Sequence, residues 1–422
     1  MAVANGRVVR ILLAAGSPRK EISDWILEKG REPEMSNRGC LKILWLIVGI
    51  GLLCPFCTGS PAPDPQRESN PFFQIVPTPN ENQPYPKQNY LESVSASSGT
   101  DIWSVGASTI HYDGHVWTAF RAPDMTGNGN NLLNGVADVS TNNVWAVGYI
   151  NFQVIGAYQS PIVEHFDGTS WSIFSSPQFT PPDTASLNAI TAISANDIWA
   201  GGELFEDPYA FPLLEHFDGN SWTQSEPPVS DCIVRGISAD ATNDVWAVGS
   251  TLGGGTCTLH YNGSAWEGVP SPNQCCGDNL FFGVVALAPN NAWAAGWYIQ
   301  SATDDRPQFT LVEHWDGSVW NIVPSPNVGT AGQDSSQLRG IFAASPNNVW
   351  AVGQSINIAT DEGYTLAMLW NGEKWSIVPT PSIAKNGFYA DDLDGGIALP
   401  PGDIWMVGSN DVAYTLVLKS GP

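Results

Sequence analysis

One five-residue motif recurs seven times along the chain, and it limits the folds open to this sequence more than any other feature. The motif has an aliphatic residue, Trp, two small or apolar residues and Gly. Its tryptophans are separated by 42 to 57 residues: Trp103, Trp145, Trp199, Trp246, Trp293, Trp350 and Trp405. A period of this size is typical of repeat architectures, in which each unit buries its faces only against its neighbours.

A second motif follows each of the first six tryptophans. It consists of Asp or Asn, Gly, two further residues and a second Trp, at Trp117, Trp171, Trp222, Trp266, Trp320 and Trp375. Asp-Gly or Asn-Gly between apolar runs predicts a tight hairpin in which both turn residues accept positive φ. The two motifs predict four strands per unit. Strand a is a small-residue run, strand b holds the first Trp, strand c ends at the turn, and strand d holds the second Trp.

Radial stacking of such units forms a β-propeller. The residue ten before each strand-b Trp is small, as expected where innermost strands crowd an axis: Ser93, Gly135, Ala189, Gly236, Gly283, Gly340 and Gly395. The seventh unit lacks strand d, but Phe73-Gln-Ile-Val-Pro near the N-terminus matches Trp320-Asn-Ile-Val-Pro. We therefore predict an all-β, seven-bladed β-propeller of four-stranded antiparallel blades over residues 71–422, closed by an N-terminal strand that completes the last blade.

The propeller region is strongly acidic. From residue 71 onward, 8 Lys and Arg stand against 34 Asp and Glu, and the whole chain carries a net charge of −24. Such a field repels phosphate backbones and anionic membranes, so nucleic acid is not an expected partner. No cofactor is predicted. Asp304-Asp305 and Asp361-Glu362 offer oxygen ligands for Ca²⁺, but no calcium-loop pattern surrounds them.

The first seventy residues differ from the rest, since they hold 9 of the 17 basic residues. Residues 43–53 form an apolar run after Arg38 and Lys42, which has the length of a signal-peptide core and is short for a membrane span. We assign 1–59 to an N-terminal extension with an export signal, in which Met35 is a candidate true start, and 60–70 to a Pro-rich linker. The alternative is an uncleaved membrane anchor. Either way, a secreted or cell-surface propeller is expected.

Four cysteines follow the signal, and all lie in or just after the fourth repeat: Cys232, Cys257, Cys275 and Cys276. An even, clustered set in an exported chain predicts disulfides. Because neighbouring cysteines rarely pair, we expect bridges from Cys257 to Cys275 and from Cys232 to Cys276. A metal site is the competing interpretation, but no His–Cys spacing supports it.

The units resemble those of bacterial secreted propellers with Kelch-like or Asp-box-like repeats. The Asp box places Asp, Gly and Trp on the same turn between the third and fourth strands. Here the Gly directly follows the Asp, and the Trp comes one residue sooner. The resemblance covers about residues 71–422 and implies the fold. It leaves activity open, because such propellers serve as sialidases, lyases, lectins and scaffolds.

Strand order places the start of strand a and the b–c loops at one mouth of the channel, where ligands commonly enter propellers. The residue eleven before each strand-b Trp varies, while its small neighbour does not. This set, the channel ring, is our candidate ligand site: Glu92, Asn134, Asn188, Arg235, Phe282, Arg339 and Asp394. The competing interpretation is a solvated channel in which Arg339 pairs with Asp394.

The long b–c loops carry aromatic residues beside acids, and we include four in the candidate ligand site: Tyr209, Trp297, Tyr298 and Tyr364. Such rings suit sugar stacking or peptide grooves, although they also pack readily on their own blades. Five histidines share one repeat position, so we expect structural hydrogen bonds and not catalysis from them: His111, His165, His216, His260 and His314.

These features favour an extracytoplasmic, monomeric binding module that takes a carbohydrate or protein segment on the face bearing the b–c loops. The alternative is a glycan-cleaving, sialidase- or glycosidase-like hydrolase at the channel mouth, with Glu92 and Asp394 as catalytic carboxyls. Arg235 and Arg339 would then bind an anionic group. A structural surface protein is the third hypothesis. The sequence favours the non-enzymatic hypothesis because it contains no complete set of catalytic residues.

Overall fold

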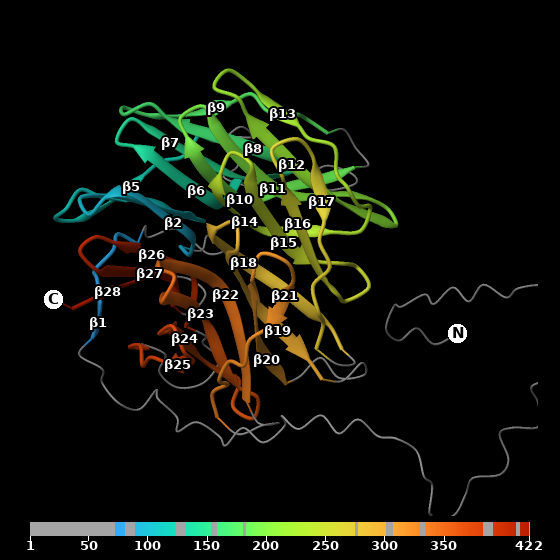
Figure 1. Cartoon of the computed structure of the whole chain (residues 1–422). Helices are drawn as coiled ribbons and strands as arrows, with labels where there is room; N and C mark the ends of the chain where they lie inside the picture. Colours follow the sequence, from blue (N-terminus) through green and yellow to red (C-terminus); the bar gives the residue numbers. More distant parts are fainter. Residues whose placement is uncertain are drawn as a thin grey trace, which may run out of the picture. The chain divides into compact units, whose positions relative to one another are not determined.

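The computed structural model describes residues 72–80, 89–123, 131–152, 158–179, 183–274, 277–300, 307–329, 334–382, 391–410 and 414–421. The predicted export signal and linker lie outside these ranges. The described residues form seven four-stranded antiparallel sheets around a common axis, which confirms the predicted propeller (Figure 1). No helix long and apolar enough to cross a membrane occurs within these ranges.

Each of the first three blades uses four consecutive strands, ordered from the axis outward. Blade 1 contains β2 (Leu91–Ser98), β3 (Asp101–Gly106), β4 (Thr109–Tyr112) and β5 (Trp117–Phe120). Blade 2 contains β6 (Asn131–Ser140), β7 (Asn143–Phe152), β8 (Tyr158–Phe166) and β9 (Trp171–Phe174). Blade 3 contains β10 (Thr184–Ser194), β11 (Asp197–Glu206), β12 (Tyr209–Phe217) and β13 (Trp222–Gln224).

The next three blades repeat this order. Blade 4 contains β14 (Ile233–Ala241), β15 (Asp244–Ser250), β16 (Thr256–Tyr261) and β17 (Trp266–Gly268). Blade 5 contains β18 (Asn279–Ala288), β19 (Asn291–Ile299), β20 (Gln308–Trp315) and β21 (Trp320–Ile322). Blade 6 contains β22 (Asp334–Ser345), β23 (Asn348–Asn357), β24 (Glu362–Trp370) and β25 (Trp375–Ile377).

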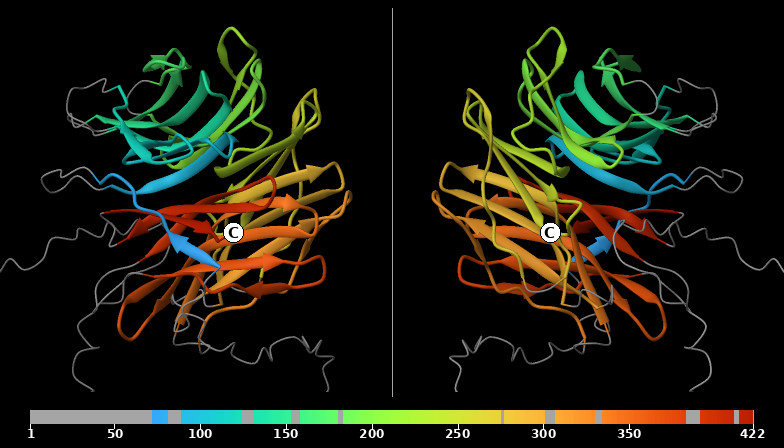
Figure 2. Two further views of the ribbon diagram at one scale, coloured as in Figure 1. Left: turned by 90° about the vertical axis from the view of Figure 1, so that its left-hand side faces the viewer. Right: turned by 90° about the vertical axis from the view of Figure 1, so that its right-hand side faces the viewer.

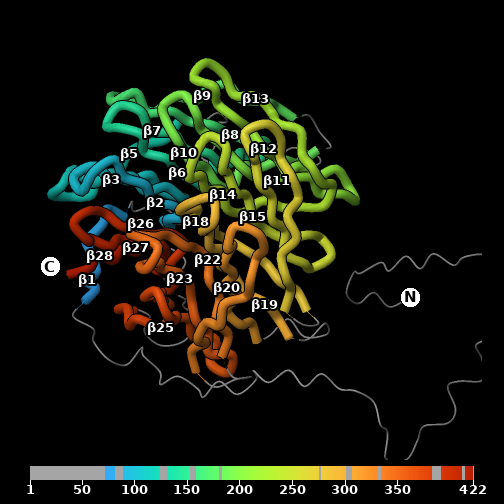
Figure 3. Tube along the Cα trace, in the orientation of Figure 1, coloured from blue at the N-terminus to red at the C-terminus, as the bar shows by residue number. Residues whose placement is uncertain are grey.

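Blade 7 joins the two ends of the propeller. It contains β26 (Asp392–Leu399), β27 (Asp403–Asn410), β28 (Tyr414–Ser420) and, as its outer strand, β1 (Phe73–Ile75). β1 pairs antiparallel with β28 in the register Phe73↔Ser420 to Ile75↔Leu418. The blue N-terminal strand therefore lies among the red C-terminal strands (Figures 2 and 3). The predicted closure is confirmed, and it leaves no blade one strand short.

Aromatic contacts link each blade to the next. The strand-b Trp of one blade meets the strand-d aromatic of the following blade, beginning with Trp103 and Trp171 at a centroid distance of 5.3 Å. The equivalent contacts close the circle: Trp145–Trp222, Trp199–Trp266, Trp246–Trp320, Trp293–Trp375, Trp350–Phe73 and Trp405–Trp117. Phe73 takes the place of a strand-d Trp, as its match to Trp320 predicts.

The repeated histidines connect the two motifs within a blade. His111 Nε2 lies 2.7 Å from Asp101 Oδ1, and the imidazole stacks on Trp103 with a centroid distance of 4.4 Å. The same hydrogen bond recurs in four more blades, as His165–Asn143, His216–Asp197, His260–Asp244 and His314–Asn291. These contacts confirm that the histidines are structural, and they explain why Asp or Asn stands two residues before the Trp.

The turns between strands c and d differ from the predicted hairpin. Only the glycine has positive φ, for example 93° at Gly114, while Asp113 does not. Instead, Asp113 Oδ1 accepts hydrogen bonds from the backbone N–H groups of His115 and Val116, both at 2.9 Å. The side chain thus supplies part of the turn, which makes Asp or Asn the required residue.

A disulfide joins Cys232 and Cys257, whose Cα atoms lie 5.8 Å apart. The two pairs predicted from the sequence are therefore wrong. Cys232 immediately precedes β14 and Cys257 lies on β16, so the bridge staples two strands of one blade. Chain spacing could not show that these two buried residues meet in the blade core. Cys275 and Cys276 lie outside the described residues.

Three glutamates are buried between blades: Glu164, Glu215 and Glu313. Glu215 and Glu313 have no hydrogen-bond partner among the described residues, and Glu164 lies near the Asn131 side chain. All three occupy one repeat position on strand c, where other blades carry aliphatic residues: Ile110, Leu259, Met368 and Leu418. Burial raises the pKa of each carboxyl from 4.5 to about 8. Each therefore holds its proton more tightly in the folded state than in the unfolded state.

We expect the folded state to lose stability as pH rises from about 4.5 to about 8, because the unfolded chain then binds fewer protons than the folded chain. Replacing Glu164, Glu215 and Glu313 together with Leu should remove much of this dependence and raise the melting temperature most at alkaline pH. Thermal melts from pH 5 to 9 measure the pH dependence of the melting temperature, with the surface substitution Glu373→Leu as the control. A triple variant with the wild-type pH profile would contradict the assignment.

Closure of the ring predicts a large effect at Phe73, which is 3% exposed, and a small one at Phe72, which is 43% exposed. Phe73→Ala removes the aromatic contact with Trp350, so we expect it to lower the free energy of unfolding by about 3–5 kcal/mol. Phe72→Ala is the matched control. Urea denaturation measures both. Because β1 closes the whole ring, we expect the weakened contact to destabilise all blades together, so the Phe73→Ala variant should still unfold in one transition. A separate unfolding transition for one blade would contradict this.

Candidate functional site

The channel ring lies at seven equivalent irregularities of the innermost strands. In β2 the pairing with β3 skips from Leu91↔Gly106 to Ser93↔Val105, so Glu92 is the extra residue of a β-bulge. The same skip leaves out Asn134, Asn188, Arg235, Phe282, Arg339 and Asp394. A bulge re-aims a side chain without disturbing the rest of the strand. All seven predicted ring residues thus have one structural origin.

The last Gly of the strand-b motif makes room for the bulge. A Cβ on Gly106 would lie 2.2 Å from the backbone oxygen of Tyr90, two residues before Glu92. The same backbone approach occurs at the other six motif glycines: Gly148, Gly202, Gly249, Gly296, Gly353 and Gly408. Any larger residue would displace strand a. The repeated Gly is therefore tied to the residue that faces the channel.

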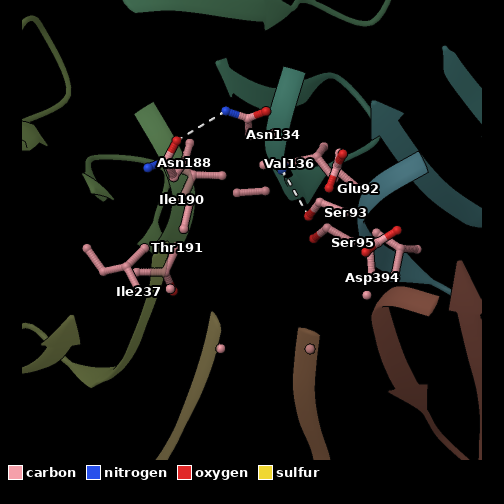
Figure 4. Close-up of a pocket in the computed structure, with 18 of the residues that line it drawn as sticks. Glu92, Ser93, Ser95, Asn134, Val136, Asn188, Ile190, Thr191, Ile237 and Asp394 are labelled. Carbon is pink, nitrogen blue, oxygen red and sulfur yellow. Dashed lines mark hydrogen bonds between the residues drawn. The ribbon is translucent and has the colours of Figure 1, made fainter. Parts of the chain in front are cut away.

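The bulged residues line one cavity of about 690 Å³ along the axis. Figure 4 shows Glu92 and Asp394 on one side and Asn134 and Asn188 on the other. The predicted small residues lie where neighbouring strands approach, since a Cβ on Gly340 would lie 2.6 Å from the backbone oxygen of Asp394. The structure therefore brings together the ring that the repeats predict.

Two asparagines tie blades 2, 3 and 4 together at the channel wall. Asn134 Nδ2 donates to the backbone oxygen of Leu187 at 2.8 Å and to Asn188 Oδ1 at 3.3 Å. Asn188 Nδ2 in turn donates to the backbone oxygen of Val234 at 2.8 Å. Both amides are thus committed partly to inter-blade contacts, and they contribute two polar, uncharged side chains to the wall.

A carboxyl-rich cluster occupies blades 6, 7 and 1. Arg339 Nη1 lies 3.1 Å from Asp394 Oδ1 and 3.4 Å from Asp392 Oδ2, which confirms the expected contact between Arg339 and Asp394. Burial and the neighbouring Asp392 raise the pKa of Asp394 well above its usual value, and burial raises that of Glu92. Three carboxyl groups share one guanidinium, so protons remain bound to part of the cluster more readily than in water.

Arg235 on blade 4 has a different environment. Its guanidinium carbon lies 5.1 Å from the centroid of the Phe282 ring on blade 5. It forms no ion pair with any residue that the structure describes, and its Nε is buried without a hydrogen-bond partner. Trp297 lies behind Phe282, with ring centroids 6.5 Å apart. The two ring arginines are therefore not equivalent.

Asp138 also lines the cavity, and sequence reasoning missed it. It stands seven residues before the strand-b Trp, where the other six repeats have Ala: Ala96, Ala192, Ala239, Ala286, Ala343 and Ala398. Asp138 Oδ2 accepts a hydrogen bond from the backbone N–H of Ser97 at 2.8 Å, while its Oδ1 is buried without a partner among the described residues. Burial raises the pKa of Asp138 to about 6. Comparison of the repeats at this position would have found it.

The four predicted loop aromatics do not join the ring in one cavity. Tyr209 is 60% exposed on blade 3, and Tyr298 packs against Phe309 on its own blade, 5.4 Å between centroids. Tyr364 Oη donates to Glu362 Oε2 at 3.0 Å on blade 6. Trp297 is the nearest to the ring, through Phe282. Contacts within their own blades account for Trp297, Tyr298 and Tyr364, whereas Tyr209 is exposed.

The loop acids give no metal centre within the described ranges. Asp304 and Asp305 lie outside them, and Glu362 Oε2 already accepts hydrogen bonds from Tyr364 and Thr360. No group of three or more His, Cys, Asp or Glu side chains there is arranged to hold a metal ion.

Comparison with known proteins identifies the fold. No family model matches the chain, and neither does any curated protein. Among solved structures it is similar to YCF48 bound to D1 peptide, at 14% identity and TM-score 0.51, covering 85% of this chain and 100% of that chain. It is also similar to the WD40 β-propeller domain of Doa1, at 10% identity and TM-score 0.50, covering 83% and 98%.

A third similar structure is the extracellular domain of BT4673 from B. thetaiotaomicron, at 9% identity and TM-score 0.50, covering 82% of this chain and 39% of that chain. At these identities the likeness shows the propeller fold alone. The Kelch-like or Asp-box-like repeat type stays a prediction.

The two arginines should respond differently to substitution. Arg339→Met leaves Asp392 and Asp394 buried without their cation, so we expect a loss of about 3–5 kcal/mol at neutral pH. The loss should shrink as pH falls and the carboxyls take up protons. Arg235→Met breaks no ion pair and should cost less. Urea denaturation at pH 5 and pH 7 measures the free energy of unfolding of both variants. An Arg339→Met variant that loses the same stability at both pH values, or no more than Arg235→Met, would contradict the assigned contacts.

Proposed function

We propose that this chain is an extracytoplasmic binding module whose ligand, a carbohydrate or a protein segment, enters the channel at the ring. One observation carries the proposal. Seven bulges present seven positions to a single cavity, where acidic, basic, amide and aromatic side chains stand among otherwise repetitive neighbours. Concave sites with a few convergent polar groups and an aromatic wall are where proteins commonly bind small ligands.

The sequence and the disulfide support the proposed location. The apolar run at residues 43–53 suits an export signal, and the Cys232–Cys257 bridge suits an oxidising compartment. We propose that the propeller is secreted or held at the cell surface, acts as a monomer and avoids nucleic acid because of its acidic charge. A similar propeller, YCF48, has been solved bound to a peptide, which supports a protein segment as one ligand class.

A hydrolase is the second candidate, and one observation favours it. Glu92 and Asp394 lie on adjacent blades of the same cavity, and both have raised pKa values, as a general acid would. Against it, Asp394 is held by Arg339. Turnover of chromogenic glycosides that disappears in Glu92→Gln without a change in melting temperature would establish this alternative.

The binding proposal predicts that at least one ligand from a panel of glycans and peptides binds at the channel ring and thereby raises the melting temperature of the protein. At saturating concentration, about 100 times Kd, the gain is ~2.7 kcal/mol. We expect Phe282→Ala to abolish the shift and Tyr209→Ala, on an exposed hairpin, to preserve it. If only Tyr209→Ala loses the shift in melting temperature, the ligand binds at the exposed b–c hairpins and not at the ring. If no ligand in the panel shifts the melting temperature, a structural role is favoured.

A further inference from the structure

Positive charge is scarce in the propeller, so its placement is informative. From residue 71 onward the sequence has 8 Lys and Arg, and two of them, Arg235 and Arg339, belong to the seven-residue ring. Arg339 is neutralised by Asp392 and Asp394. Arg235 has no ion-pair partner among the described residues, although the sequence from residue 71 onward contains 34 Asp and Glu. It is the cation in this cavity that remains available to a ligand.

The surroundings of Arg235 largely shield it from water without providing an ion-pair partner among the described residues. Glu203 is the opposite charge that acts on the guanidinium, from beyond ion-pair distance. Asn188, the ring residue of the preceding blade, donates to the backbone of Val234, which is next to Arg235 in β14. On the other side the Phe282 ring lies under the guanidinium. Desolvation of a cation without an acceptor for all its N–H groups carries a free-energy cost. A ligand acceptor at the two terminal nitrogens would remove part of that cost.

We propose that Arg235, backed by Phe282, is the subsite that binds a carboxylate of the ligand. This inference rests on the proposed function, because it assigns a chemistry to the same cavity. The planar guanidinium can donate two parallel hydrogen bonds to the two oxygens of a carboxylate. The Phe282 ring offers an apolar contact to the carbon skeleton next to that carboxylate. Both an acidic sugar and a peptide carboxyl group carry this chemistry.

The charge of the rest of the protein selects a carboxylate over a more highly charged anion. The residues from 71 onward carry a net charge of −26, from 8 basic and 34 acidic side chains. A phosphate monoester, which carries close to two negative charges at neutral pH, would be repelled about twice as strongly as a carboxylate by this field. A single negative charge is therefore the form that one guanidinium can accommodate here.

The same cavity fixes the direction of the ligand. Glu92 and Asp394 lie on blades 1 and 7, away from Arg235 on blade 4, as the order of strands around the axis requires. These carboxyl groups disfavour a second anion on their side and accept hydrogen bonds from hydroxyl or amine groups. The ligand should therefore place its acidic end against Arg235 and its hydroxyl or amine groups against blades 7 and 1.

Matched acid–neutral pairs test the subsite. We would titrate galacturonate against galactose, and N-acetyl-alanyl-phenylalanine as the free acid against its amide, by calorimetry with the full chain. A charge-assisted hydrogen bond is worth about 1.5–3 kcal/mol, so the preferred acid should bind at least about tenfold more tightly than its neutral partner. The pair that shows the preference identifies an acidic sugar or a peptide carboxyl as the source.

Variants assign that preference to Arg235. We expect Arg235→Gln to remove it, Arg235→Lys to retain part of it, and Arg121→Gln, at an exposed site outside the cavity, to leave it unchanged. Circular dichroism of each variant confirms that it folds.

Two results would overturn the inference. If acid and neutral partners bind equally and both lose binding in Phe282→Ala, the binding module stands and the carboxylate subsite fails. If no probe binds at millimolar concentration while a neutral glycan from the stabilising panel does, the subsite likewise fails. If neither the probes nor the panel produces binding through the ring, the proposed function fails as well.

Discussion

The contact between a strand-b Trp and the strand-d aromatic of the next blade holds the ring together. Each blade contributes one partner to the contact before it and one to the contact after it, so every blade depends on two neighbours. The circle closes only because Phe73, from the start of the described propeller, packs on Trp350 beside the C-terminal strands. In five of the blades, a histidine bonded to Asp or Asn holds the Trp in position from within the blade.

The same repeat separates scaffold from site. The motif Gly of strand b allows the backbone of strand a to come close, and strand a responds with a bulge at the same place in every blade. The bulged side chain leaves the blade core for the channel, so it lies outside the apolar packing between blades, although Asn134, Asn188 and Arg339 make polar contacts across blades at the channel wall. Variation at this position is therefore tolerated, and seven unlike side chains can converge on one cavity while the surrounding strands keep their regular pattern.

Much of this arrangement could be predicted from the sequence because it depends on periodic features. Trp spacing predicts the blades, the match of Phe73 to Trp320 predicts the closure, and the small residue beside the bulge predicts the channel ring. The spacing also indicates which histidines are structural, since five copies of one residue cannot form a unique site.

What the sequence could not predict depends on contacts between non-repeating residues. The Cys232–Cys257 pairing, the burial of Glu215 and the lack of an ion pair at Arg235 among the described residues all depend on the positions of side chains in space. The prediction of two positive φ angles in the turn between strands c and d was wrong. The Asp113 side chain accepts backbone hydrogen bonds there, so only Gly114 needs a positive φ. Asp138 is different, because its departure from six alanines was visible in the sequence.

A crystal structure of the chain with a stabilising ligand would test the central claim most directly. Our account predicts density in the axial cavity, within hydrogen-bond distance of Arg235 and in contact with the Phe282 ring, with Arg339 still paired to Asp394. Ligand density on the exposed b–c hairpins around Tyr209, or along the outer strands with an empty channel, would contradict it. Either location would mean that the seven bulges serve the fold and not binding.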